Sequence, residues 1–221
     1  MPTVERLMSF YERSEGKLSF SVKANRLLTH EIGIDWQVVA KDFKEALKPL
    51  NEKERLSAVL FQLSKSFHYT NDNRIYLAKL IGEFEGFPVM VEFRHKEWIR
   101  ESVFEGLEKR KAGIVFCDMP MCHLAQTSII STHANGAKAT YTAGESPNGS
   151  DRYCYDYSDE ELAQFVPIIK QANREGKKVQ VYFNNHPNGS GAKNAISLRK
   201  MIEKDETGKI RKNFKFQHIL F

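Results

Sequence analysis

The amino-acid sequence predicts an α/β protein, a TIM-like (β/α) barrel of about six parallel strands with helices on the outside. Strand-like runs alternate with amphipathic helical stretches, which is the pattern of right-handed βαβ units and a parallel sheet. In the run at 88–94, Glu92 and Arg94 share one face, and Val91 and Phe93 share the other. The alternative, an open doubly wound sheet, is apolar on both faces, so one polar face favours a barrel.

Six short runs rich in β-branched and aromatic residues are predicted to form the strands. Their first residues follow no constant interval, which excludes a solenoid of equal repeats. The predicted strands are Leu18–Ala24, Leu56–Leu63, Pro88–Arg94, Gly113–Asp118, Ser128–Ala134 and Val179–Asn185.

Helices are predicted where apolar residues recur at intervals of three and four. One of them follows a capping signal, Ser158 with Glu161, which satisfies free N–H groups of a first helical turn. A long segment at 136–156, rich in Gly, Asn and Ser, is predicted to be a loop. The predicted helices are Val4–Glu12, Trp36–Leu50, Asn73–Phe84, Glu97–Ala112, Asp159–Glu175 and Ala192–Ile202.

Composition narrows the class of protein. The chain has 221 residues, of which 41% are hydrophobic, so we expect one globular domain over 1–221. No apolar run approaches the roughly 18 residues of a membrane span, and the first residues lack the apolar core of a signal peptide. Three cysteines do not make a disulfide framework, so we expect a protein of the reducing cytoplasm, without a membrane partner.

The formal net charge of +5 is concentrated near the C-terminus. Residues 199–215 hold seven basic and three acidic side chains, and the rest of the chain is nearly balanced. We therefore expect a basic tail at 203–221 and no basic surface over the whole fold. Such a tail either keeps the chain soluble or contacts nucleic acid.

Polar side chains cluster at the C-terminal ends of the predicted strands, where parallel α/β folds carry their sites. A carboxylate, a guanidinium and an imidazole fall within four consecutive residues, Glu92 to His95. Glu92 is predicted as a general acid or base, Arg94 as an anion clamp and His95 as a proton shuttle. The alternative is a buried Glu92–Arg94 ion pair that orders the mouth of the barrel.

The other predicted site residues come from further strand ends. Asp118 is predicted as a second base or a metal ligand, with a helix cap or turn as the alternative. Lys23 is predicted to hold a phosphate, a carboxylate or a Schiff base, with pairing to Glu92 or Asp118 as the alternative. The predicted substrate contacts are Lys23, His30, Gln62, Arg94, His133, Asn135, Asn184 and Asn185.

No metal site and no cofactor are assigned from the sequence. Cys117, Cys122 and His123 lie close together, but no second pair stands at zinc spacing, and Cys117 falls within a strand. His68 and His218 have no partner nearby in sequence and are predicted to be surface residues.

A series of motifs follows in a set order along the chain. They are Phe20–Ala24, Leu60–Leu63, Val91–His95, Asp118, Arg152-Tyr153, Tyr157–Leu162, Val181–Asn185 and Leu220-Phe221. In this order they resemble the YecE-like family, whose domain of unknown function is number seventy-two in its series. The resemblance covers nearly the whole chain and implies a TIM-like barrel with no established activity, because a fold does not specify a function.

This chain differs from the pattern of the family in two places. The family begins with about two strand–helix units before the helix Val4–Glu12, so we expect this chain to lack them through a misassigned start or a broken gene. The alternative is a partner chain that covers the open sheet edges. The family's Arg-x-His-Gly pattern aligns with His133-Ala134-Asn135-Gly136, so His133 and Asn135 replace an Arg and a His of the implied site.

Three functional hypotheses remain. The first is an enzyme that acts at the C-terminal rim of the barrel on a small polar or phosphorylated substrate. The second is a barrel that binds or processes nucleic acid, with an affinity that falls steeply as salt rises. The third is an inactive, truncated paralogue. The sequence does not specify an oligomeric state.

Overall fold

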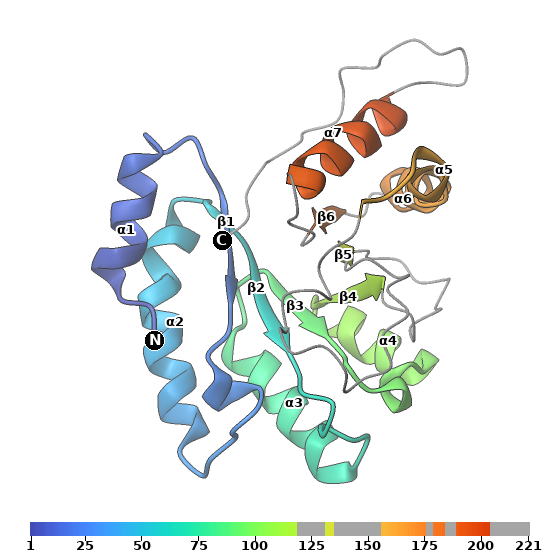
Figure 1. Ribbon diagram of the computed structural model, residues 1–221. Helices are drawn as coiled ribbons and strands as arrows, with labels where there is room; N and C mark the ends of the chain where they lie inside the picture. The colour runs from blue at the N-terminus through green and yellow to red at the C-terminus, as the bar shows by residue number, and fades with distance from the viewer. Residues whose placement is uncertain (119–130, 135–155, 176–178, 184–188, 204–221) are drawn as a thin grey trace, which may run out of the picture. The chain divides into compact units, whose positions relative to one another are not determined.

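The computed structural model describes residues 1–118, 131–134, 156–175, 179–183 and 189–203, with the backbone alone at 116–118 and 131–134 (Figure 1). A boundary between Ile114 and Val115 separates two compact units. Each unit is built of parallel strands and helices, so the predicted α/β class is confirmed. No helix in these residues is long and apolar enough to cross a membrane.

The first unit contains three parallel strands, β1 (Phe20–Lys23), β2 (Leu56–Gln62) and β3 (Val89–Glu92). Each lies within the run that the sequence predicts. In the register of the sheet, Lys23 is opposite Leu60, and Gln62 is opposite Glu92. The three strands therefore end at one edge of the sheet, and their last polar residues are neighbours.

Helices of the first unit flank these strands. They are α1 (Val4–Arg13), α2 (Trp36–Glu52), α3 (Asn71–Glu83) and α4 (Glu101–Lys109), with short 3-10 turns η1 (Arg26–Leu28) and η2 (Lys96–Trp98). Helix α2 packs against α1, α3 and β2, as Figure 1 shows. Its apolar stripe buries Phe43 against Phe84, whose ring also meets Phe61 of β2 at 5.1 Å. This aromatic core holds the strands in place.

The predicted helix at 97–112 is wrong in its first turn, where the structure has η2 and a separate helix α4. The His95 ring accepts from the N–H of Glu97 and caps η2. Arg100 then adopts an extended backbone before α4 begins. Between these points Trp98 is buried and donates its indole N–H to the carbonyl of Phe67 at 2.6 Å. The extended backbone of Arg100 separates η2 from α4, and Trp98 is buried within η2.

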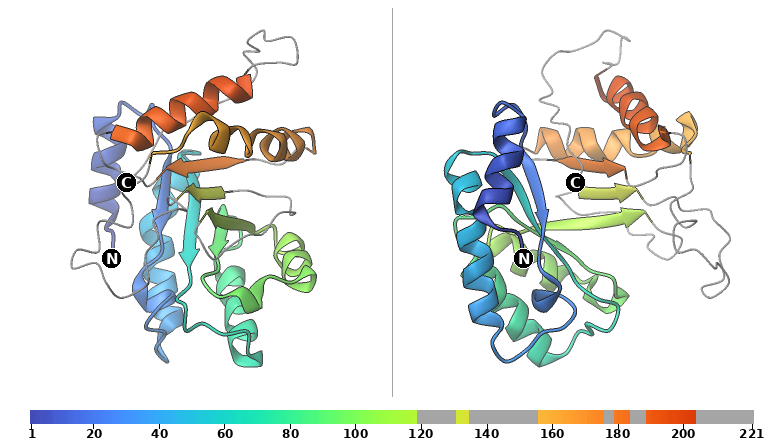
Figure 2. Two further views of the ribbon diagram at one scale, coloured as in Figure 1. Left: turned by 45° about the vertical axis from the view of Figure 1, so that its right-hand side comes forward. Right: turned by 60° about the vertical axis from the view of Figure 1, so that its left-hand side comes forward.

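The second unit contains the strands β4 (Gly113–Asp118), β5 (Ser131–Ala134) and β6 (Gln180–Phe183), of which β4 starts just before the boundary. All three run parallel and lie side by side (Figure 2). Three helices belong to this unit, α5 (Asp159–Ala163), α6 (Val166–Arg174) and α7 (Ser190–Glu203). Helix α7 packs against α5, α6 and β6.

The predicted helix at 159–175 is also wrong as a single element. Its start is confirmed, since Ser158 and Glu161 form a capping box with bonds of 3.2 and 3.0 Å. The helix stops at Ala163 and resumes at Val166 because Pro167 has no N–H to donate to the Ala163 carbonyl.

Candidate functional site

The ends of β1, β2 and β3 bring four predicted site residues into one chain of contacts. Lys23 Nζ donates to Gln62 Oε1 at 2.5 Å, and Gln62 Nε2 donates to Glu92 Oε1 at 2.8 Å. Arg94 Nε forms an ion pair with the same Glu92 oxygen. We call Lys23, Gln62, Glu92 and Arg94 the strand-end cluster. The cluster joins residues from three strands, as the parallel sheet predicts.

Burial changes steeply along this cluster. The Glu92 side chain is 0% exposed and that of Arg94 19%, whereas Gln62 is half-buried and Lys23 is exposed. The ion pair that the sequence offered as an alternative for Glu92 and Arg94 is therefore present. A buried carboxylate with these two partners can hold the guanidinium and the amide in fixed positions.

His30 lies in the field of several cations. Its Nδ1 is 2.8 Å from the hydroxyl of Thr29, which is buried. Partial burial lowers the pKa of His30, and the positive charges of Lys23, Arg26 and Arg94 lower it further, against the opposing charge of Glu31. The neutral imidazole is therefore favoured, and a bound anion would reverse that preference.

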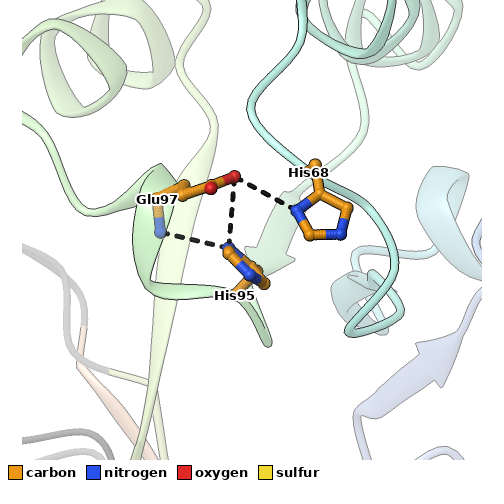
Figure 3. A group of neighbouring side chains, drawn as sticks. All are labelled: His68, His95 and Glu97. Atoms are coloured by element: carbon orange, nitrogen blue, oxygen red, sulfur yellow. Dashed lines mark hydrogen bonds and ion pairs between the residues drawn. The ribbon is translucent and has the colours of Figure 1, made fainter.

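A second group of side chains comes from the segments that follow β2 and β3. His68, His95 and Glu97, which we call the two-histidine cluster, converge as Figure 3 shows. Glu97 Oε2 is 3.3 Å from His68 Nδ1 and 3.4 Å from His95 Nδ1. The N–H of Tyr69 donates to Glu97 Oε2 and holds the pKa of Glu97 below its usual value, and both imidazoles add to this effect.

Sequence reasoning found only His95 of this cluster. His68 is 54% exposed, in agreement with its prediction as a surface residue, but it has partners from another part of the chain. Its ring centroid is 4.4 Å from that of His95. The usable signal was the predicted adjacency of the two strands, because segments that follow neighbouring parallel strands emerge at the same edge.

An aromatic stack lies beside the two-histidine cluster. The centroid of the Trp98 ring is 4.8 Å from that of Phe93 and 5.3 Å from that of Phe67, and the rings of both pairs are nearly parallel. Because Phe67 precedes His68 and Trp98 follows Glu97, this stack ties together the two segments that carry the cluster.

Five of the eleven predicted site residues lie where side chains are not described. Asp118 and His133 are the backbone partners of Ala134 and Cys117, respectively, in β4 and β5. Asn135, Asn184 and Asn185 lie outside the described residues. Their predicted roles therefore stay predictions.

Asn194 of α7 has a structural role within the second unit. Its Oδ1 accepts from the N–H of Tyr157 at 3.2 Å, and its Nδ2 donates to the Tyr157 carbonyl at 3.0 Å. Nδ2 also donates to Asp156 Oδ1 at 3.1 Å. Asn194 is only 4% exposed, so its amide serves as a buried partner for the backbone that precedes α5.

Asn194→Asp is expected to destabilise the chain by about 2–4 kcal/mol, because the new carboxylate loses both donated hydrogen bonds and faces a carbonyl and a second carboxylate. Urea unfolding followed by circular dichroism measures the effect. Asn173→Asp, the same change at an exposed position of α6, is the control and should stay within about 0.5 kcal/mol of the parent. Equal unfolding midpoints for the two variants would contradict the assignment.

Comparison with known proteins places this architecture in a family. A curated relative, the UPF0759 protein YunF of Bacillus subtilis, is 25% identical over 182 residues. That match covers 75% of this chain and 64% of the relative, so the chain spans less than two thirds of YunF.

Solved structures agree in fold. A DUF72 family protein from Thermotoga maritima superposes with a TM-score of 0.77 at 28% identity, over 92% of this chain and 80% of the other. A DUF72 family protein from Enterococcus faecalis gives a TM-score of 0.78 at 22% identity, over 97% and 85%. The family model described as "Protein of unknown function DUF72" matches residues 1–216. The predicted resemblance is therefore confirmed, and this chain belongs to the DUF72 family.

Proposed function

We propose that the chain is an enzyme that takes a small phosphorylated or otherwise anionic substrate at the C-terminal ends of β1, β2 and β3. The observation that carries this proposal is the strand-end cluster with His30 in its field. Lys23 and Arg94 supply two positive charges against the single carboxylate of Glu92. Within the described part of the chain, Lys23 makes no ion pair, and its Nζ donates to the neutral amide of Gln62.

Each member of the cluster has a proposed part in binding. Lys23 and Arg94 contact the anion, which a charge-assisted hydrogen bond favours over neutral ligands. Glu92 is buried and holds Arg94 directly and Lys23 through Gln62, so it is a positioning residue for both cations. The acid–base role that the sequence predicts for Glu92 stays a prediction, and its burial at 0% exposure between Arg94 and Gln62 favours the positioning role.

Five further residues are proposed as members of a site from their positions in the sequence. We propose a (β/α) barrel for the chain, and Asp118, His133, Asn135, Asn184 and Asn185 stand at or near the ends of its predicted strands. Strand ends are the usual position of catalytic groups in such barrels. The cysteine content supports a reducing, cytoplasmic setting for this chemistry.

Anion binding is expected to raise the pKa of His30. In the free protein this pKa lies below its ordinary value of about 6.5, and a bound anion offsets the field of Lys23, Arg26 and Arg94. Affinity should therefore increase as pH falls through the pKa of His30. NMR titration of the imidazole signals with and without sulfate measures both effects, because sulfate keeps its charge over this range.

Two lysine variants test whether Lys23 contributes to sulfate binding. Lys23→Ala should weaken sulfate binding by about tenfold or more, the loss of one charge-assisted contact. Lys17→Ala is the control, because Lys17 pairs with Glu15 at an exposed position, and it should bind sulfate as the parent does. An unchanged His30 pKa at millimolar sulfate would overturn the proposal.

Competition with a single-stranded oligonucleotide tests the second hypothesis. A small-molecule site predicts that phosphomonoesters displace sulfate at least as well as the oligonucleotide does. Tighter binding of the oligonucleotide, lost steeply as salt rises, would favour nucleic acid instead. Turnover by a longer family member but not by this chain would favour the inactive paralogue.

A further inference from the structure

We propose that His68, His95 and Glu97 bind a divalent transition-metal ion of the zinc class. The site lies in the segments that follow β2 and β3. It uses none of the four residues of the strand-end cluster. The zinc proposal therefore goes beyond the anion site and is tested independently of it. Each residue offers one ligand atom, and no two of these atoms are more than 4.8 Å apart.

The distances fit a tetrahedral ion. Zinc lies about 2.0–2.1 Å from imidazole nitrogen and 2.0–2.2 Å from carboxylate oxygen. At the tetrahedral angle such bonds place neighbouring ligand atoms about 3.4 Å apart. Glu97 Oε2 is 3.3 Å from His68 Nδ1 and 3.4 Å from His95 Nδ1. The ligand atoms of the two imidazoles lie within 4.8 Å of each other, and an approach to tetrahedral spacing falls to His68, whose side chain is 54% exposed.

The lone pair of His95 Nδ1 has a hydrogen-bond donor in this structure. This nitrogen accepts from the Glu97 N–H at 3.3 Å and lies 3.4 Å from the Glu97 carboxylate. An imidazole nitrogen has one lone pair, so metal binding through Nδ1 requires this long hydrogen bond to open. A bond to the metal ion then replaces it.

The surrounding residues hold the ligands in place. The Tyr69 N–H donates to Glu97 Oε2 at 3.2 Å, and Asn73 Nδ2 donates to the His68 carbonyl at 2.8 Å. The Trp98 indole N–H bonds to the Phe67 carbonyl at 2.6 Å and joins the two ligand-bearing segments. Support of this kind is what orients the ligands of a metal site.

The ligand set selects the class of ion. Two imidazoles and one carboxylate suit zinc and its neighbours in the first transition row, whereas Mg²⁺ and Ca²⁺ prefer oxygen ligands alone. Three protein ligands leave a position for water or substrate, as catalytic zinc sites do. A metal-bound His95 does not carry protons, so this inference replaces the proton shuttle predicted for that residue.

Isothermal titration of the full chain, without a histidine tag and after dialysis against a chelator, tests the site with ZnCl₂. The parent is expected to bind one equivalent with micromolar affinity or better. His68→Ala and Glu97→Gln should each weaken this binding by about 100-fold or more, because either change removes a ligand. Glutamine at 97 can still accept the Tyr69 N–H, and His68 is exposed, so both variants should fold.

His30→Ala and Glu101→Gln are the controls, since they make the same changes at exposed positions outside the cluster, and they should bind zinc as the parent does. Circular dichroism confirms that every variant folds. Absence of zinc binding to the parent would overturn the proposal. Retention of parental affinity by both His68→Ala and Glu97→Gln would overturn it as well.

Discussion

Arg94→Ala is expected to destabilise the chain by about 3–5 kcal/mol, the cost of removing one partner from a buried ion pair. The Glu92 carboxylate is 0% exposed, so water cannot replace the guanidinium at its oxygen. The Gln62 amide donates a hydrogen bond to the carboxylate but carries no charge. Urea unfolding followed by circular dichroism gives the change in the free energy of unfolding.

Removing the charge of Glu92 should lower the free energy of unfolding much less than removing Arg94. Glu92→Gln keeps the shape of the side chain, and Arg94, at 19% exposure, can regain water when its partner loses charge. We therefore expect a loss of about 1–2 kcal/mol, close to that of one hydrogen bond. In the double variant the two losses should not add, because each single change disturbs the same pair.

Arg6→Ala is the control for this pair, because Arg6 is exposed on α1. Its free energy of unfolding should stay within about 0.5 kcal/mol of the parent. Equal losses for Arg94→Ala and Glu92→Gln would contradict the asymmetry and with it the positioning role of Glu92. A folded Glu92→Gln variant with weakened sulfate binding would support that role.

Trp98→Ala is expected to cost about 3–5 kcal/mol, typical of a buried aromatic side chain removed from a core. Trp98 is 2% exposed, stacks on Phe93 and Phe67, and donates its indole N–H to a backbone carbonyl. Trp98→Phe should keep most of the stacking and lose about 1 kcal/mol for the hydrogen bond. Urea unfolding measures both.

Trp36→Ala is the matched control, since Trp36 is only half-buried and meets Tyr76 edge to face. It should cost clearly less than Trp98→Ala. If the two cost the same, the stack around Trp98 is not the anchor of these segments. Zinc affinity should fall in Trp98→Ala and persist in Trp36→Ala. Of these two tryptophans, only Trp98 contacts Phe67 and so joins the segments that bear His68 and Glu97.

The sequence predicted those features of the fold that depend on neighbouring residues in the chain. Each strand of the structure lies within its predicted run because alternation and β-branched content are properties of consecutive residues. The capping box at Ser158 and Glu161 is equally local and is confirmed. The break at Pro167 was also visible in the sequence, but the apolar spacing on both sides predicted one helix. There the missing N–H of one residue outweighed the periodicity.

The sequence by itself determined the α/β class, the order of the elements and the polar residues at the ends of β1 to β3. These follow from short-range periodicity and from the rule that parallel strands end at a shared edge. Only the tertiary structure decided which of these residues meet. Gln62 is 39 residues from Lys23 and 30 residues from Glu92 in the chain, and the register of the strands brings the three together. His68 and Glu97, 29 residues apart, meet because Trp98 packs against Phe67, and no local pattern encodes that contact.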